Sequence, residues 1–264
     1  MTYFICRIPF GTSELKIKTL NEIPDSTAEE ISYFINAFYN ELNPNLANTS
    51  AYNFNHGQIG IPIFLKKEFL DFLSQHLELA AATEFEYQPF SILDPDLDLN
   101  SNLISVDKRS LSVTKNDDIS LESPINRKHF TIDILSDFLI REKALSDFLI
   151  VSDSVFLARG KHPWAIDITD HTVQDFTLEI RNESVVIEPM EVKTMKNTFG
   201  VIDEISPVQY IFIQGKYTNL PKIIGTIAKR ERSLGGLSEV SRKYGVTIHA
   251  LDKNDKLTTF TPRH

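Results

Sequence analysis

Histidine and cysteine are the side chains most often used to bind zinc, and their spacing in this chain does not fit a zinc site. None of the seven histidines pairs with another histidine or a cysteine at a ligand spacing, and the HExxH motif is absent. His76 lies on the apolar face of a predicted helix, so we interpret it as a core residue. The GxSxG motif of serine hydrolases and the GxxxxGK(S/T) motif of P-loop proteins are also absent. The sequence therefore argues against zinc chemistry, serine hydrolysis and P-loop phosphate binding.

An acidic loop offers oxygen ligands of the kind that hard cations prefer. Its polar residues alternate along the chain: Asp94, Asp96, Asp98, Asn100 and Asn102. An EF-hand loop starting at Asp94 needs a glycine at position 99 and a glutamate at position 105, where the chain has Leu99 and Ser105. We therefore interpret this segment as a solvated loop.

The segment 237–251 resembles a helix-turn-helix, with Gly245 at the turn and apolar residues at core positions. A recognition helix must meet phosphates and base edges, but the acidic residues Asp252 and Asp255 follow this segment. A helix that ends at Gly245 and leads into a strand explains the pattern better. The net charge of −9 also makes nucleic acid an unfavourable partner. DNA binding through 237–251 stays as an alternative.

Helices and strands are interspersed along the chain, with several consecutive strands in its second half. The apolar periodicity predicts a first helix with its stripe from Ile31 to Leu42, and further helices over about 62–82, 130–144, 220–232 and 237–244. The strand-like segments are 3–9, 14–19, a hairpin over 104–115, 147–158, 164–169, 176–181, 184–188, 208–215, 246–251 and 256–261. We therefore predict an α+β fold, a mixed or antiparallel sheet with packed helices, in a single domain over residues 1–264.

Composition narrows the class of protein further. The chain has 264 residues, of which 42% are hydrophobic and 24% charged, as is typical of globular proteins. Its one cysteine, Cys6, cannot form a disulfide within the chain. The apolar run at the start is shorter than the roughly 7–15 residues of a signal peptide core, and no run approaches the roughly 20 residues of a membrane helix. We therefore expect a cytoplasmic protein without a membrane segment.

Three turns in the first half of the chain carry polar or aromatic residues at recognisable spacings. Phe10-Gly11-Thr12 precedes a strand. Thr49 and Asn55 lie six residues apart in an asparagine-rich segment after the first helix. The segment 83–90 follows the second helix and contains Tyr87 and Pro89.

Two segments in the second half extend this series. Lys128-His129-Phe130-Thr131-Ile132-Asp133 lies at a helix start, with five residues from the lysine to the aspartate. Gly160 and Trp164 come just before a strand. In order and spacing, these segments resemble the ApbE family of magnesium-dependent FAD:protein FMN transferases. That family has Met-Gly-Thr, Ser-x-x-Ser-x-x-Asn and Lys-Gly-Tyr-Ala-Val-Asp at the corresponding places.

The resemblance implies an activity and a set of binding residues. The family transfers FMN from FAD to a threonine or serine hydroxyl of an acceptor flavoprotein and releases AMP. The flavin nucleotide would be FAD. The positions that match the family's binding residues are Thr12, Asn55, Tyr87, Lys128 and Asp133. The resemblance identifies no catalytic residue.

The metal site departs from the family pattern. The resemblance places metal ligands on Ser136 and Thr226, but Lys222 stands where the family's Asp-x-x-x-Thr motif has its aspartate. A lysine repels a cation that an aspartate would bind, which argues against Mg²⁺ here. Asp153 and Ser154 also replace a glycine pair, and these side chains limit how closely a nucleotide can approach the backbone. We therefore expect a flavin-binding protein with weak or no transferase activity; the alternative is a non-catalytic protein-interaction scaffold.

Overall fold

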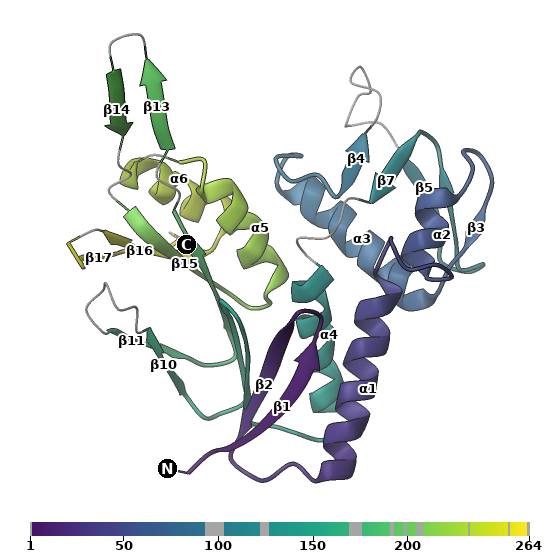
Figure 1. The fold of residues 1–264 in the computed structure, drawn as a ribbon, viewed down its shortest axis with the longest axis horizontal. Coiled ribbons are helices and arrows are strands. Elements are labelled where there is room, and N and C mark those ends of the chain that lie inside the picture. Colours follow the sequence, from purple (N-terminus) through teal and green to yellow (C-terminus); the bar gives the residue numbers. More distant parts are fainter. Residues whose placement is uncertain are drawn as a thin grey trace. The chain divides into compact units, whose positions relative to one another are not determined.

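The computed structural model describes residues 2–92, 103–121, 127–168, 176–190, 193–197, 200–204, 208–231, 233–252 and 254–262. The chain divides into two compact units, one formed by Met1–Ala28 with Ile132–His264 and the other by Glu29–Thr131 (Figure 1). The acidic loop over 94–102 lies outside the described residues. Among the described residues, no helix combines the length and the apolar character that crossing a bilayer requires.

An eight-stranded sheet organises the first unit, in the order β1-β2-β8-β9-β12-β15-β16-β17. Its strands are β1 (Phe4–Phe10), β2 (Ser13–Thr19), β8 (Phe148–Ser152), β9 (Val155–Arg159), β12 (Ser184–Pro189), β15 (Val208–Gly215), β16 (Thr247–Asp252) and β17 (Leu257–Phe260). Every neighbouring pair is antiparallel. The predicted α+β class with an antiparallel sheet and packed helices is therefore confirmed.

The two faces of this sheet are covered differently. On one face, the hairpin of β10 (Trp164–Ile168) and β11 (Phe176–Ile180) places Trp164 in a core with Val185 and Phe212. On the other face, α5 (Asn219–Ala228) contacts β12 and β15, and α6 (Leu234–Tyr244) contacts β16 (Figure 1). A second hairpin pairs β13 (Lys193–Asn197) with β14 (Gly200–Glu204). Trp164 thus has a packing role.

Helices and small sheets make up the second unit. Its elements are most of α1 (Asp25–Glu41), α2 (Ser50–His56), β3 (Ile63–Phe64), α3 (Lys67–Ala82), β4 (Phe90–Ile92), β5 (Ile104–Asp107), β6 (Ser112–Lys115), β7 (Ile119–Leu121) and the first turn of α4 (Arg127–Arg141). Helix α1 buries Ile31, Ile35 and Phe38, the helical stripe that the periodicity predicted. His76 is 1% exposed and its Nδ1 lies 2.8 Å from the Phe72 carbonyl oxygen, so its assignment to the core is confirmed. Burial lowers the pKa of His76 to about 4.

Several predicted boundaries were wrong for local reasons. The helix expected over 62–82 begins at Lys67, because Ile63–Phe64 forms a strand against β6. Residues 50–56 form a helix that the asparagine-rich segment concealed, and Thr49 caps it by accepting from the Tyr52 N–H. The segment 147–158 forms two strands joined at Asp153, whose φ of 47° is tolerated by aspartate in a tight turn. Asp153 therefore supports the hairpin turn without a glycine.

The preferred interpretation of 237–251, a helix that ends at Gly245 and leads into a strand, is confirmed, and the helix-turn-helix alternative was wrong. Helix α6 ends at Gly245, which has the left-handed φ of 65° expected of a C-cap glycine. The residues that would form a second helix form β16, which pairs with β15 and β17. Ile248 and Ala250 are buried on one face of β16, because alternate residues of a strand point to the same side. The segment is therefore part of the sheet.

Candidate functional site

Asp133 caps the start of helix α5 from helix α4. Its Oδ1 accepts from the Thr218 N–H at 2.8 Å and its Oδ2 accepts from the Asn219 N–H at 3.1 Å. Thr218 itself makes no side-chain cap. The first N–H groups of a helix have no partner within the helix, so a carboxylate at this place satisfies them and complements the helix dipole. Asp133 therefore joins two helices that are far apart in sequence.

Burial dominates the electrostatics of Asp133, which is 5% exposed. Burial raises its pKa from 3.8 to about 7, although the hydrogen bonds from Thr218 and Asn219 and the charge of Arg159 lower it. Arg159 is itself buried, with Nη1 donating to the Ala158 carbonyl oxygen and the guanidinium 5.1 Å from the Tyr217 ring centre. The carboxyl group of Asp133 therefore titrates near neutral pH in the folded protein.

Lys222, which the resemblance aligns with the family's metal aspartate, is paired with a buried carboxylate. Its Nζ contacts Oε1 of Glu188 on β12, and Lys229 Nζ lies 2.5 Å from Oε2 of the same side chain. The Glu188 side chain is 3% exposed, whereas those of Lys222 and Lys229 are 19% and 31% exposed. Burial raises the pKa of Glu188, but hydrogen bonds and charge from the two lysines outweigh it and hold the pKa below its ordinary value. Glu188 is therefore an ionised carboxylate shared by two ammonium groups.

The other positions assigned to a metal do not complete a magnesium site. The Thr226 hydroxyl donates to the Lys222 carbonyl oxygen at 3.2 Å, a bond within helix α5. The Ser136 Oγ is buried and has no hydrogen-bond partner among the described residues. Nowhere in the described part of the chain do three His, Cys, Asp or Glu side chains cluster in a way that could hold a metal. Mg²⁺ prefers carboxylate and other oxygen ligands. The Glu188 carboxylate is already paired with two lysines, so it does not fit a magnesium ligand.

In the second unit, Asn55 binds a neighbouring strand. Its Oδ1 accepts from the Leu121 N–H at 2.8 Å, and its Nδ2 donates to the Leu121 carbonyl oxygen at 3.2 Å. Lys115, which is 2% exposed, donates to the carbonyl oxygens of Asn55 and Ile119. Burial lowers the pKa of Lys115, and the charge of Asp118 acts in the opposite direction. The side-chain amide of Asn55 therefore holds α2 to β7.

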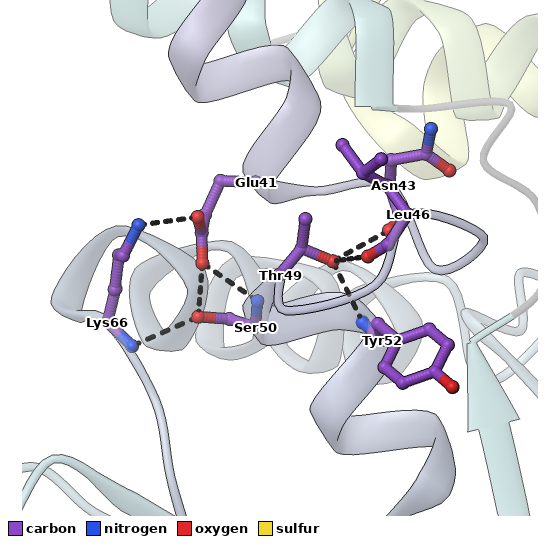
Figure 2. Close-up of polar contacts among 7 residues, drawn as sticks. All are labelled: Glu41, Asn43, Leu46, Thr49, Ser50, Tyr52 and Lys66. Carbon is purple, nitrogen blue, oxygen red and sulfur yellow. Dashed lines mark hydrogen bonds and ion pairs between the residues drawn. The ribbon is translucent and has the colours of Figure 1, made fainter.

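Figure 2 shows the polar network that fixes the other end of α2. Glu41, in the last turn of α1, accepts from both the N–H and the hydroxyl of Ser50, at 2.8 and 2.5 Å. Its second oxygen accepts from Lys66 Nζ at 2.6 Å. Thr49 adds the N-cap and lies 2.8 Å from the carbonyl oxygens of Asn43 and Leu46. The network orients α2, which carries Asn55 about one turn and a half further on.

We expect Glu41→Ala to destabilise the protein by about 1–3 kcal/mol, because it leaves the Ser50 N–H and hydroxyl without their charged acceptor. Urea unfolding monitored by circular dichroism measures this change. Glu41→Gln is the matched control, since its amide oxygen still accepts from Ser50 while the charge is lost. Equal stability of Glu41→Ala and the unmodified chain would contradict a role of Glu41 in fixing α2.

The remaining positions that the resemblance assigned lie in different settings. Thr12 is exposed in the turn between β1 and β2. Tyr87 is half-buried, with its ring centre 6.0 Å from that of His76. Lys128 is half-buried near the start of α4. By unit, Asn55, Tyr87 and Lys128 belong to the second, and Thr12, Asp133, Ser136 and Thr226 to the first.

The sequence analysis missed Glu188 and Lys229, although both left a signal. In the strand SVVIEP, the alternation that buries Ser184 and Val186 also turns Glu188 inward. A fully buried glutamate is rare unless it is paired. Lys222 and Lys229 are seven residues apart on one helix, so they share a face over two turns. The sequence could therefore have indicated that two lysines on one helix face pair with a buried carboxylate. It could not have indicated which carboxylate that is.

Comparison with known proteins finds similar structures but no matching family model or curated sequence. No protein-family model matches the chain. No curated protein sequence matches it either. The Vibrio cholerae flavin transferase ApbE is 14% identical, with a TM-score of 0.65 over 99% of this chain and 97% of that one. The Pseudomonas stutzeri flavinyl transferase ApbE is 14% identical, with a TM-score of 0.70 over 99% and 95%. The Thermotoga maritima ApbE protein is 10% identical, with a TM-score of 0.71 over 98% and 97%.

These matches span both units of the chain at low sequence identity, so what they share with it is the backbone arrangement. The chain has the fold of the ApbE flavin transferases.

Proposed function

We propose that this chain binds a flavin nucleotide and that this nucleotide is FAD. We also propose that metal-dependent transfer of FMN by this chain is weakened or lost. The ApbE fold over nearly the whole chain supports the ligand class, because the similar structures are flavin transferases. The pairing of Lys222 with Glu188 carries the second half of the proposal. A divalent cation offsets the charge of a nucleotide diphosphate during group transfer, and the ammonium groups at this place would repel that cation.

Two of the residues that the resemblance assigned to nucleotide binding, Asp133 and Asn55, have a structural role in this proposal. Asp133 keeps the position that the resemblance assigned to nucleotide binding, but both its carboxylate oxygens accept backbone N–H groups of Thr218 and Asn219. Asn55 is likewise engaged, by both backbone groups of Leu121. These residues therefore shape the backbone around them, and a nucleotide would rely on other groups of the chain for its charge.

The proposal is tested by titrating FAD into the purified chain and following flavin fluorescence, once with EDTA and once with millimolar Mg²⁺. We expect binding under both conditions with similar affinity. A second assay offers a flavoprotein acceptor with an available threonine and looks for covalently attached FMN, where we expect little or none.

Each outcome separates the candidate functions. Efficient, magnesium-dependent FMN transfer would contradict the loss of metal chemistry. If FAD does not bind under either condition, the flavin proposal fails, and a non-catalytic protein-interaction scaffold becomes the better description. Riboflavin and AMP, titrated separately, show which part of FAD the chain recognises.

A further inference from the structure

Two lysines on one face of helix α5 enclose Glu188. Lys222 and Lys229 are two turns apart, and each contacts a different oxygen of the Glu188 carboxylate. Gly225 lies between them, and a Cβ at that position would come within 2.8 Å of Glu188 Cγ. A larger residue at 225 would push the carboxylate away from the helix. The glycine therefore allows one carboxylate to hold both ammonium groups.

The charge of this cluster is unbalanced. Two ammonium groups and one carboxylate leave a net charge of +1, that is 2 − 1. Each ammonium has three N–H donors, of which Glu188 takes one from each lysine. The lysine side chains are 19% and 31% exposed, so their other donors can meet a ligand from solvent. Lysine is a common phosphate binder because it presents a compact point charge.

We propose that Lys222 and Lys229, held in place by Glu188, bind a phosphate or diphosphate group of the ligand and so take over the role of a divalent cation. This inference rests on the proposed function for the identity of the nucleotide, but its charge argument does not. Glu188 acts as a positioning residue, because it keeps two like charges side by side that would otherwise repel each other. The site therefore works without added metal.

The test uses two partial ligands, inorganic pyrophosphate, which has no flavin, and riboflavin, which has no phosphate. We expect pyrophosphate and FAD to bind in EDTA, to bind no more tightly when Mg²⁺ is present, and to bind more weakly as salt is added. Lys222→Met and Lys229→Met are each expected to weaken both ligands by about tenfold, the effect of about 1.4 kcal/mol. Riboflavin binding should not change in either variant.

Two further variants control for loss of folding and for a general effect of removing a positive charge. Lys222→Arg retains the positive charge and should bind pyrophosphate within about threefold of the unmodified chain, which removes the ambiguity if Lys222→Met fails to fold. Lys256→Met removes an exposed lysine elsewhere in the same unit and should have no effect.

The results distinguish failure of the inference from failure of the proposed function. The inference is overturned if FAD binds only with Mg²⁺, or if both methionine variants bind pyrophosphate as well as the unmodified chain does. If pyrophosphate binding depends on the lysines while FAD and riboflavin do not bind, the anion site stands and the flavin proposal falls.

Discussion

Replacing Asp133 by Asn is expected to remove a contribution to stability that falls as pH rises from about 4 to about 7, while His76, whose pKa is about 4, keeps its opposite contribution in both proteins. The pKa of Asp133 rises from 3.8 in the unfolded chain to about 7 in the folded protein. Between these values Asp133 of the folded protein holds a proton that the unfolded chain has released, so the contribution of Asp133 to the free energy of unfolding falls as pH increases. At about 1.4 kcal/mol per pH unit over about three units, the fall is about 4 kcal/mol.

This prediction is measured by urea unfolding at a series of pH values from about 4 to 8. The amide side chain of the Asp133→Asn variant would still offer one oxygen to the first N–H groups of α5, so we expect the variant to fold. Asp137→Asn, one turn further along α4, is the control and should leave the pH slope unchanged. If the difference in free energy of unfolding between Asp133→Asn and the unmodified chain stays constant over this pH range, the buried carboxyl does not titrate near neutral pH.

Replacing Glu188 by Gln should give the second large effect, a loss of about 2–4 kcal/mol at neutral pH. The change leaves Lys222 and Lys229 without a charged partner while the size of the side chain stays nearly the same. The estimate is at the lower end for a broken buried pair, because the lysine side chains are 19% and 31% exposed and solvent screens them. Chemical unfolding of the two proteins at pH 7 measures the difference.

The pH dependence of this second effect has the opposite sign to that of Asp133. The pKa of Glu188 lies below its ordinary value of 4.5 in the folded protein, so its stabilisation is complete above that value and disappears as pH falls through the folded pKa. The gap between the unmodified chain and Glu188→Gln should therefore close in acid. Asp71→Asn, which breaks the exposed pair with Lys67, is the control and should cost no more than about 0.5 kcal/mol. A cost for Glu188→Gln no larger than that of this control would show that the pair is not held as the structure describes.

Local sequence patterns were sufficient to predict the fold class and most elements. The stripe of Ile31, Ile35 and Phe38 predicted α1, because residues three and four apart share a helix face. Gly245 marked the end of α6, because glycine adopts a left-handed φ at little cost. His76 was assigned to the core from its helical position alone. The errors occurred in short elements, such as α2 and β3, where the periodicity extends over too few residues to be read.

The candidate site was only partly predictable from the sequence. The resemblance placed Asp133 and Lys222, but not what they bind. Asp133 caps a helix whose first residues lie 85 and 86 positions away, and Lys222 pairs with a glutamate 34 positions away. Motif spacing describes neighbours along the chain and carries no information about such partners.

The sequence by itself determined the α+β class and the helices with long apolar stripes. These features depend on residues close together in the chain, where helical and strand periodicity acts. Only the tertiary structure decided that Glu188 faces two lysines and that Asp133 is buried at the start of α5. The partner and the pKa of a buried charge depend on which distant segments exclude water around it, and packing of the whole unit sets that arrangement.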